Sequence, residues 1–223
     1  MRTLIGLFVL AAVASAGEAE DKRLNEAATV LTEIMGTGDN AIPQNLIEKA
    51  ACAVIVPGMK KGGFIVGAKY GRGFATCRKA TGVGWSAPSG VRIEGGSVGF
   101  QIGGAEVDII LLVMNKKGMD RLTSSKFTLG GEASVAAGPV GRDTQAQTDA
   151  SMRAEILSWS RSRGVFGGIA LQGATLRRDT EVDTALYGAN KPVLEILDGH
   201  IAPPAAAKSL LATLNKYSSR PNK

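Results

Sequence analysis

The stretch that decides the fold is residues 51–70, which read ACAVIVPGMKKGGFIVGAKY. Ala51–Val56 and Phe64–Tyr70 are short runs rich in β-branched residues, and Pro57-Gly58 and Gly62-Gly63 interrupt the chain between them. Apolar runs of this length, bounded by glycine and proline, predict consecutive strands joined by turns. The stretch therefore predicts the beginning of an antiparallel sheet, with a turn at each interruption.

Later apolar runs continue this pattern along the chain. Val91–Phe100 and Val107–Met114 predict two more strands, and the turn residues Arg163-Gly164 separate Glu155–Arg161 from Val165–Leu176, which predicts a hairpin. Glycine makes up 29 of the 223 residues, against an average of roughly 7%. Frequent glycine inside apolar runs is typical of tightly bent strands.

Four segments predict helices on either side of these strands or between them. Apolar residues recur at helical spacing over Leu24–Met35 and over Ala205–Tyr217, and a shorter helix is predicted for Pro43–Ala50. Asn115 is a candidate N-cap for a helix that reaches Ser125, between two strands. From Asp179 to Pro203 the sequence predicts only loosely ordered chain.

The order of these elements predicts an α+β fold. N-terminal helices precede a glycine-rich antiparallel sheet with one inserted helix, and a C-terminal helix follows, without the regular alternation that a parallel sheet requires. Whether the sheet closes as a barrel or stacks as a sandwich stays open. A chain of 223 residues favours one domain with appendages. The predicted division is a signal peptide (1–16), an N-terminal amphipathic helix (17–41), the main domain (42–191) and a C-terminal tail with a helix (192–223).

The first sixteen residues have the features of a secretory signal peptide. Arg2 precedes the apolar run Leu4–Val13, and Ala14-Ser15-Ala16 forms a small-residue cleavage pattern ahead of Gly17. The run is shorter than the roughly 20 apolar residues that cross a bilayer. We therefore expect cleavage near Ala16 and a periplasmic or secreted mature protein.

An oxidising compartment would let Cys52 and Cys77 form one disulfide. The alternative is two buried free thiols, because both cysteines lie in apolar runs. The chain has no C-x-x-C pair, and His200 is its single histidine. Neither a metal site nor a reactive thiol is therefore expected.

Recognisable catalytic motifs are missing from the sequence. It contains no P-loop, no G-x-G-x-x-G before a helix and no S-x-x-K. His200 is expected in a loop, so a hydrolase that uses His200 or a pair of carboxylates is the weaker hypothesis. The sequence predicts a protein that is not an enzyme, with no catalytic residues and no cofactor.

Basic residues at predicted turns and helix faces are the more informative feature. The chain carries 26 lysine and arginine residues against 20 acidic residues, a net charge of +6. If the fold gathered several of them on one face, each would contribute about 1 kcal/mol to binding an anionic membrane. Alternatively, they are the dispersed charged turns of any β-rich domain. Nucleic acid is not an expected partner, because aromatic residues for base stacking are scarce. The candidate lipid-binding residues are Lys22, Arg23, Lys60, Lys61, Lys116, Lys117, Arg161 and Arg163.

Several longer motifs follow one another in a characteristic order. They are Gly84–Pro88, Arg92–Gly103, Asp108–Asn115, Ser125–Gly130, Ala136–Arg142 and Trp159–Gly164. In this order they resemble the SYLF domain family, over about residues 42–191. The resemblance implies a lipid-binding module. Eukaryotic members of the family bind phosphoinositides and, in some cases, actin, beside a Src-homology or FYVE domain, whereas bacterial members resemble this chain in being exported single domains.

Two features of the chain limit what the resemblance implies. Lipid contacts of the family are ascribed partly to a basic N-terminal helix, to which Lys22 and Arg23 correspond, but residues 22–37 are charge-balanced. An exported protein would not meet actin or cytosolic phosphoinositides, so the expected partner is an anionic phospholipid surface. A structural or protein-interaction role in the cell envelope is the alternative, and the oligomeric state stays open.

Overall fold

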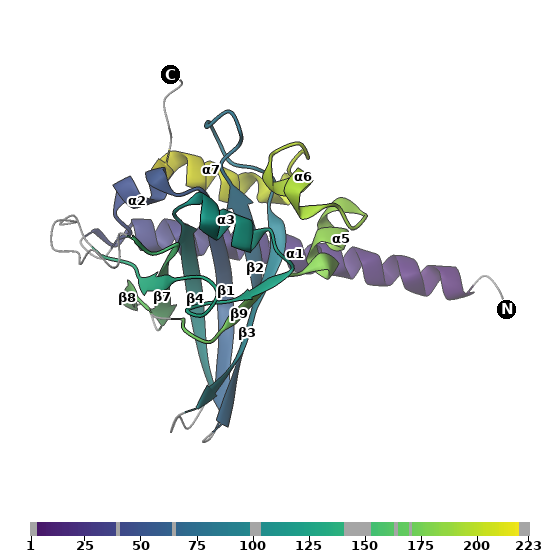
Figure 1. Ribbon diagram of the computed structural model, residues 1–223. Coiled ribbons are helices and arrows are strands. Elements are labelled where there is room, and N and C mark those ends of the chain that lie inside the picture. Colours follow the sequence, from purple (N-terminus) through teal and green to yellow (C-terminus); the bar gives the residue numbers. More distant parts are fainter. Residues whose placement is uncertain are drawn as a thin grey trace.

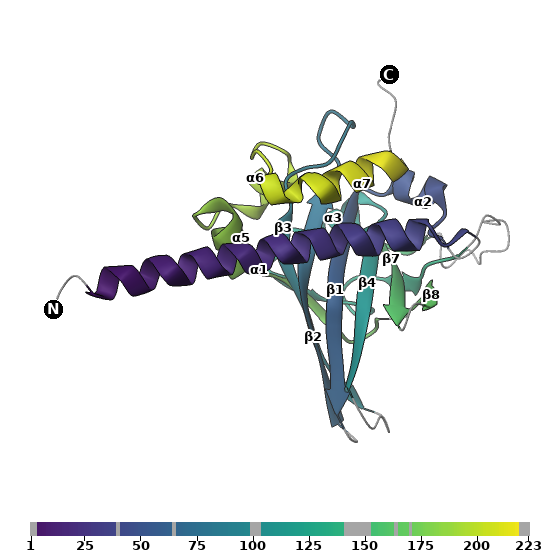
Figure 2. The ribbon, with the colours of Figure 1, turned by 180° about the vertical axis from the view of Figure 1, so that it is seen from behind.

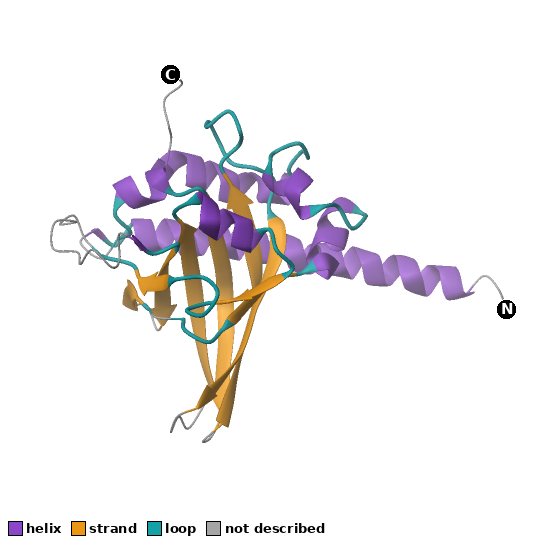
Figure 3. Cartoon of the chain, in the orientation of Figure 1, coloured by secondary structure: helices purple, strands orange, loops and turns teal. Residues whose placement is uncertain are grey.

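The computed structural model describes residues 4–38, 41–63, 66–98, 104–140, 153–162, 165–169 and 171–218. Figure 1 shows a single sheet that curls into a half-barrel, with helices on both of its faces. The secondary-structure colouring in Figure 3 separates the helical layer from long strands that extend beyond it. The α+β prediction is confirmed, and the sheet is neither a closed barrel nor a two-layer sandwich.

The sheet in the described residues has nine strands. Their order is β5-β9-β3-β2-β1-β4-β7-β6, with β8 paired to β7, and neighbours run antiparallel except for the parallel pair β6 and β7. Sequence neighbours β1, β2 and β3 lie side by side, whereas β4 pairs with the far edge of β1. The strands are β1 (Cys52–Gly63), β2 (Val66–Cys77), β3 (Ser89–Val98), β4 (Gly104–Val113), β5 (Lys126–Thr128), β6 (Val135–Ala137), β7 (Ile156–Ser162), β8 (Val165–Gly168) and β9 (Thr175–Arg178).

Helices cover the two faces of the sheet unequally. The long helix α1 crosses one face beside α7, and we call this the outer face (Figure 2). The smaller helix α3 lies on the opposite, inner face (Figure 1). The helices described are α1 (Leu4–Met35), α2 (Gln44–Lys49), α3 (Lys116–Leu122), α5 (Thr180–Tyr187), α6 (Val193–Leu197) and α7 (Lys208–Ser218), with a 3-10 turn at Ala205–Ala207 before α7.

Alternation along the strands builds two cores, one on each face of the sheet. On β1, Ala53 and Ile55 join the outer core, whereas Cys52, Val54 and Val56 join the inner core. The predicted apolar stripe of α1 packs into the outer core, where Leu24, Leu31 and Ile34 are buried against the sheet and α7. The apolar stripe of α1 and the apolar residues on one face of the strands therefore pack against each other in the outer core.

Cys52 and Cys77 face one another across β1 and β2 and form a disulfide within the inner core. Both side chains are buried, so the bond is shielded from solvent. The pairing joins the first residue of β1 to the last residue of β2, and thereby closes the base of the hairpin.

Pro57-Gly58 does not form the predicted turn. Strand β1 continues through both residues, and its register shifts between Val56 and Met59 against β4, which marks a bulge. Gly58 adopts a positive φ of 59°, a conformation that glycine tolerates, and Met59 returns to the inner core. At Gly62-Gly63, in contrast, β1 does end, as the sequence predicted.

Two further predictions, both about the second half of the chain, need correction. The predicted hairpin forms between β7 and β8, but Val165–Leu176 is not one strand, because Thr175 and Leu176 belong to β9 and pair with β3. The predicted loose segment after Asp179 is wrong: the Asp179 side chain caps α5 by accepting from the Val182 N–H. Strands β5 and β6 were not predicted.

The first and last helices, α1 and α7, both contribute residues to the outer core. Helix α1 runs without interruption from Leu4 to Met35, through the predicted cleavage site. At the other end, Leu210 and Leu214 of α7 are buried in the outer core, so the C-terminal segment is part of the same packed unit. Within the described residues, every helix is too short or too polar to span a bilayer.

Candidate functional site

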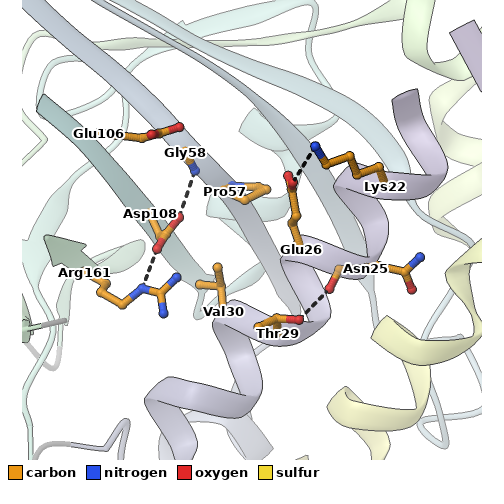
Figure 4. A pocket seen from close by; sticks show the side chains of 10 residues that line it. All are labelled: Lys22, Asn25, Glu26, Thr29, Val30, Pro57, Gly58, Glu106, Asp108 and Arg161. Atoms are coloured by element: carbon orange, nitrogen blue, oxygen red, sulfur yellow. Dashed lines mark hydrogen bonds and ion pairs between the residues drawn. The ribbon is translucent and has the colours of Figure 1, made fainter. Parts of the chain in front are cut away.

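A polar cleft of about 770 Å³ lies where α1 passes over the bulge of β1. Figure 4 shows side chains of α1 facing those of β1, β4 and β7 across this cleft. The polar flank of α1 beside its apolar stripe supplies one wall, and alternate residues of β4 supply the other. The lining residues are Lys22, Asn25, Glu26, Thr29, Val30, Pro57, Gly58, Glu106, Asp108 and Arg161.

Asp108 and Arg161 form the floor of this cleft. The Asp108 carboxylate accepts from the Gly58 N–H at 2.8 Å and from Arg161 Nε at 2.5 Å, and Arg161 also pairs with Glu33 of α1. Burial raises the pKa of the Asp108 carboxyl, the Gly58 hydrogen bond opposes that rise, and the charges of Glu106 and Glu26 add to it. The charge of Arg161 is thus shared between two carboxylates and links α1 to the sheet.

Glu106 lies at the lip of the cleft, above Gly58. A Cβ atom at Gly58 would stand 2.7 Å from Glu106 Oε1, so the absent side chain leaves room for this carboxylate. In total, three acidic side chains and two cationic ones line the cleft. Its lining is therefore acidic by one charge, the opposite of what a binding site for anionic lipid requires.

A second, smaller cavity of about 200 Å³ lies on the other side of Pro57 and Gly58, which line both cavities. Arg23 of α1, Lys60 of β1 and Arg72 of β2 line it together with Tyr70, and among the described residues that line it none is acidic. We call it the basic cavity. It brings together two of the residues predicted from the sequence, Arg23 and Lys60.

The three cations of the basic cavity differ in their ion pairs. Arg23 pairs with Glu20 one turn away on α1, and Arg72 pairs with Asp179 at 2.8 Å and with Glu181 at the start of α5. Lys60 is exposed, and no carboxylate of the described residues forms an ion pair with it. Lys60 is therefore the cation most available to a ligand.

The other predicted basic residues are dispersed. Lys22 lies 3.9 Å from Glu26, and on α3 the residues Lys116 and Lys117 pair with Asp120 and Glu155. Because α3 packs into the inner core and α1 into the outer core, Lys116 and Lys117 do not share a face with Arg23 and Lys60. Arg163 lies outside the described residues.

Lys61 lies on the inner face, opposite Lys69 in the register of β1 and β2. Burial, followed by the charge of Lys69, lowers the pKa of the Lys61 ammonium. Like charges directly opposite one another destabilise a strand pair. This pair therefore adds positive charge to the same end of the hairpin as Lys60, but on the other side of the sheet.

Arg72 was missed by sequence reasoning. It lies within β2 rather than at a turn, two residues from Tyr70 and therefore on the same face of the strand. Its neighbours across the sheet are Arg92 and then Arg177. The period-two spacing of Tyr70 and Arg72 was readable in the sequence, but the long-range register that brings arginines together was not.

Nothing in the described parts of the chain assembles histidine, cysteine and carboxylate side chains into a metal site. His200 is exposed in the loop after α6. The described site thus consists of a charged cleft and a basic cavity that share Pro57 and Gly58, beside the N-terminal helix. A family model described as "Las17-binding protein actin regulator" matches residues 94–217. The chain belongs to this Ysc84 family, also called the SYLF domain family, as the motif order indicated.

Curated relatives support this assignment. The chain is 34% identical over 177 residues to "SH3 domain-containing protein PJ696.02" of Schizosaccharomyces pombe, covering 78% of the chain and 41% of that protein. It is 31% identical over 206 residues to "SH3 domain-containing YSC84-like protein 1" of Rattus norvegicus, covering 91% and 60%. It is 30% identical over 189 residues to "LAS seventeen-binding protein 3" of Saccharomyces cerevisiae, covering 82% and 41%. The chain thus spans about half the length of these relatives.

Proposed function

We propose that this protein is exported and binds membrane surfaces that contain anionic phospholipid, through its basic cavity. The observation that carries the proposal is the convergence of Arg23, Lys60 and Arg72 around a cavity without an acidic lining residue. The three cations come from α1, β1 and β2, so the folded chain, not a local sequence cluster, creates the site.

The chemistry of the cavity suits a phosphate group. Arginine offers a planar fork of N–H donors that matches phosphate oxygens, and lysine adds a mobile point charge. Tyr70 is 45% exposed beside these cations, and a ring of this kind places an apolar body with a polar tip at a membrane interface. Lys61 and Lys69 would extend the positive potential around the end of the hairpin.

Vesicle co-sedimentation with Lys60→Ala tests the proposal. We expect binding to phosphatidylglycerol-rich vesicles at low salt, weaker binding as salt screens the charges, and no binding to pure phosphatidylcholine. Loss of one lysine near the surface costs about 1 kcal/mol, so the Lys60→Ala partition coefficient should fall roughly fivefold.

Lys49→Ala is the matched control. Lys49 is an exposed lysine at the end of α2, before the start of β1, whereas Lys60 lies near the other end of that strand. The control should bind like the parent protein. Equal losses in both variants, or binding that salt does not change, would show that the basic cavity is not the membrane site.

The names of the relatives favour a second candidate, in which the domain binds a protein partner. "LAS seventeen-binding protein 3" is named for such a partner. A pull-down in which a protein is retained in high salt and without lipid, by Lys60→Ala as well as by the parent, would favour this candidate.

A further inference from the structure

The two cavities beside α1 have opposite charge and share a wall. Pro57 and Gly58 line both of them. On one side lie Arg23, Lys60 and Arg72, and on the other side the carboxylates of Glu26, Glu106 and Asp108 outnumber the cations Lys22 and Arg161. The boundary between positive and negative surface is therefore one bulged segment of β1.

Lys60 and Glu106 stand on either side of this boundary. They are paired in the register of β1 and β4, on the outer face of the sheet, and no ion pair joins them in the described part of the chain. Glu106 instead reaches over Gly58, as the close view in Figure 4 shows. Lys60 thus lines the basic cavity and Glu106 lines the acidic cleft, and the two side chains do not pair with each other.

We propose that the paired cavities bind one zwitterionic group, a phosphate joined by a short linker to a primary amine, as in a phosphoethanolamine head group. This inference rests on the proposed function, because the phosphate would occupy the basic cavity. The ammonium group would enter the acidic cleft beside Glu106.

The spacing across β1 and β4 fits this ligand. Residues opposite one another in an antiparallel pair have Cβ atoms about 5 Å apart. A phosphorus and a nitrogen separated by two carbons and one oxygen are four bonds apart, and because the bond angles bend the chain, bonds of about 1.5 Å span roughly 5 Å when it is extended. The ligand is therefore of about the same length as the spacing between the positions of Lys60 and Glu106 on the two strands.

The cleft is suited to an ammonium group in two further respects. Asp108 is already engaged by Arg161 and the Gly58 N–H, so Glu106 is the carboxylate left for a ligand. Burial is the main cause of the raised pKa of Asp108, but the charges of Glu106 and Glu26 add to the rise, and these two carboxylates would attract another positive charge to the cleft. A primary ammonium also donates hydrogen bonds to a carboxylate, whereas a quaternary one cannot.

Titration of the full chain with soluble probes tests the inference. O-phosphoethanolamine should bind more tightly than phosphocholine or inorganic phosphate, by roughly fivefold, the upper end for an exposed charge pair. Glu106→Gln should abolish this preference and leave the affinity for inorganic phosphate unchanged. Lys60→Ala should weaken the binding of all three probes. Glu132→Gln, an exposed carboxylate after β5, is the control and should keep the preference.

The outcomes separate this inference from the proposed function. If Glu106→Gln keeps the preference for O-phosphoethanolamine, or if no preference exists, the zwitterion site is wrong even where Lys60→Ala weakens phosphate binding. If Lys60→Ala changes nothing, the basic cavity fails as well. Phosphatidylcholine vesicles that contain phosphatidylethanolamine then show whether the ligand is a lipid head group or a free small molecule. A head group in a bilayer requires vesicle binding that Glu106→Gln reduces. A free small molecule requires binding of the soluble probe alone.

Discussion

Replacing Trp159 with alanine should lower the free energy of unfolding by about 3–5 kcal/mol, the range for removing a large buried aromatic side chain. Trp159 of β7 is fully buried in the outer core. Its indole N–H donates to the Pro139 carbonyl at 2.8 Å, and a Cβ at Gly138 would stand 2.1 Å from the ring. The ring therefore fixes the segment after β6 against the sheet, and its loss leaves both a cavity and an unpaired carbonyl.

Urea unfolding followed by far-ultraviolet circular dichroism measures this loss. Val165→Ala is the control, because Val165 lies on the neighbouring strand β8 and is 72% exposed, so its effect should stay within about 0.5 kcal/mol. Gly138→Ala should also destabilise, by about 1–3 kcal/mol, because the added methyl group overlaps the ring. Similar unfolding midpoints for Trp159→Ala and Val165→Ala would contradict the packing described.

Removal of the disulfide should have the second largest effect on stability. Cys52 and Cys77 are 25 residues apart in sequence, and a crosslink across a loop of this length stabilises the fold by about 3–4 kcal/mol through the entropy of the unfolded chain. The variant Cys52→Ala/Cys77→Ala should lose about this amount, measured by chemical unfolding in buffer without reductant.

A reductant provides the internal control for this prediction. Dithiothreitol should lower the midpoint of the parent protein toward that of the double variant, and should leave the double variant unchanged. Because both cysteines are buried, reduction should be slow under native conditions. A parent midpoint that does not respond after unfolding in reductant would show that the bond contributes nothing.

The sequence predicted those elements whose signals are local. The stripe of α1, the Asn115 cap of α3 and the strand end at Gly62-Gly63 all depend on residues within a few positions of one another, and the structure contains each. Pro57-Gly58 predicted a turn that does not form, because a bulge and a turn use the same residues. Only pairing with β4, about 50 residues away, distinguishes them.

The site was less predictable than the fold, because it depends on register. Lys60 was identified as a basic residue at a predicted turn and Arg23 as one on the N-terminal helix, but their meeting around one cavity requires α1 to lie over the bulge of β1. Arg72 and Glu106 lie inside strands, and their partners are set by pairing across the sheet. The charge of a residue can be read from the sequence, whereas the sign of the surface to which it contributes cannot.

The uninterrupted course of α1 has a consequence for maturation. Cleavage after Ala16 would remove Arg2 as the one charged side chain and would make Gly17 the first residue. Glu18 and Glu20 would then lie in the first turn, where negative charge interacts favourably with the positive end of the helix dipole, by about 0.3–1 kcal/mol each. The contacts of Leu24, Leu31 and Ile34 would remain. Cleavage would thus replace the apolar start of α1 by an acidic first turn, and the part of α1 that packs in the outer core would stay unchanged.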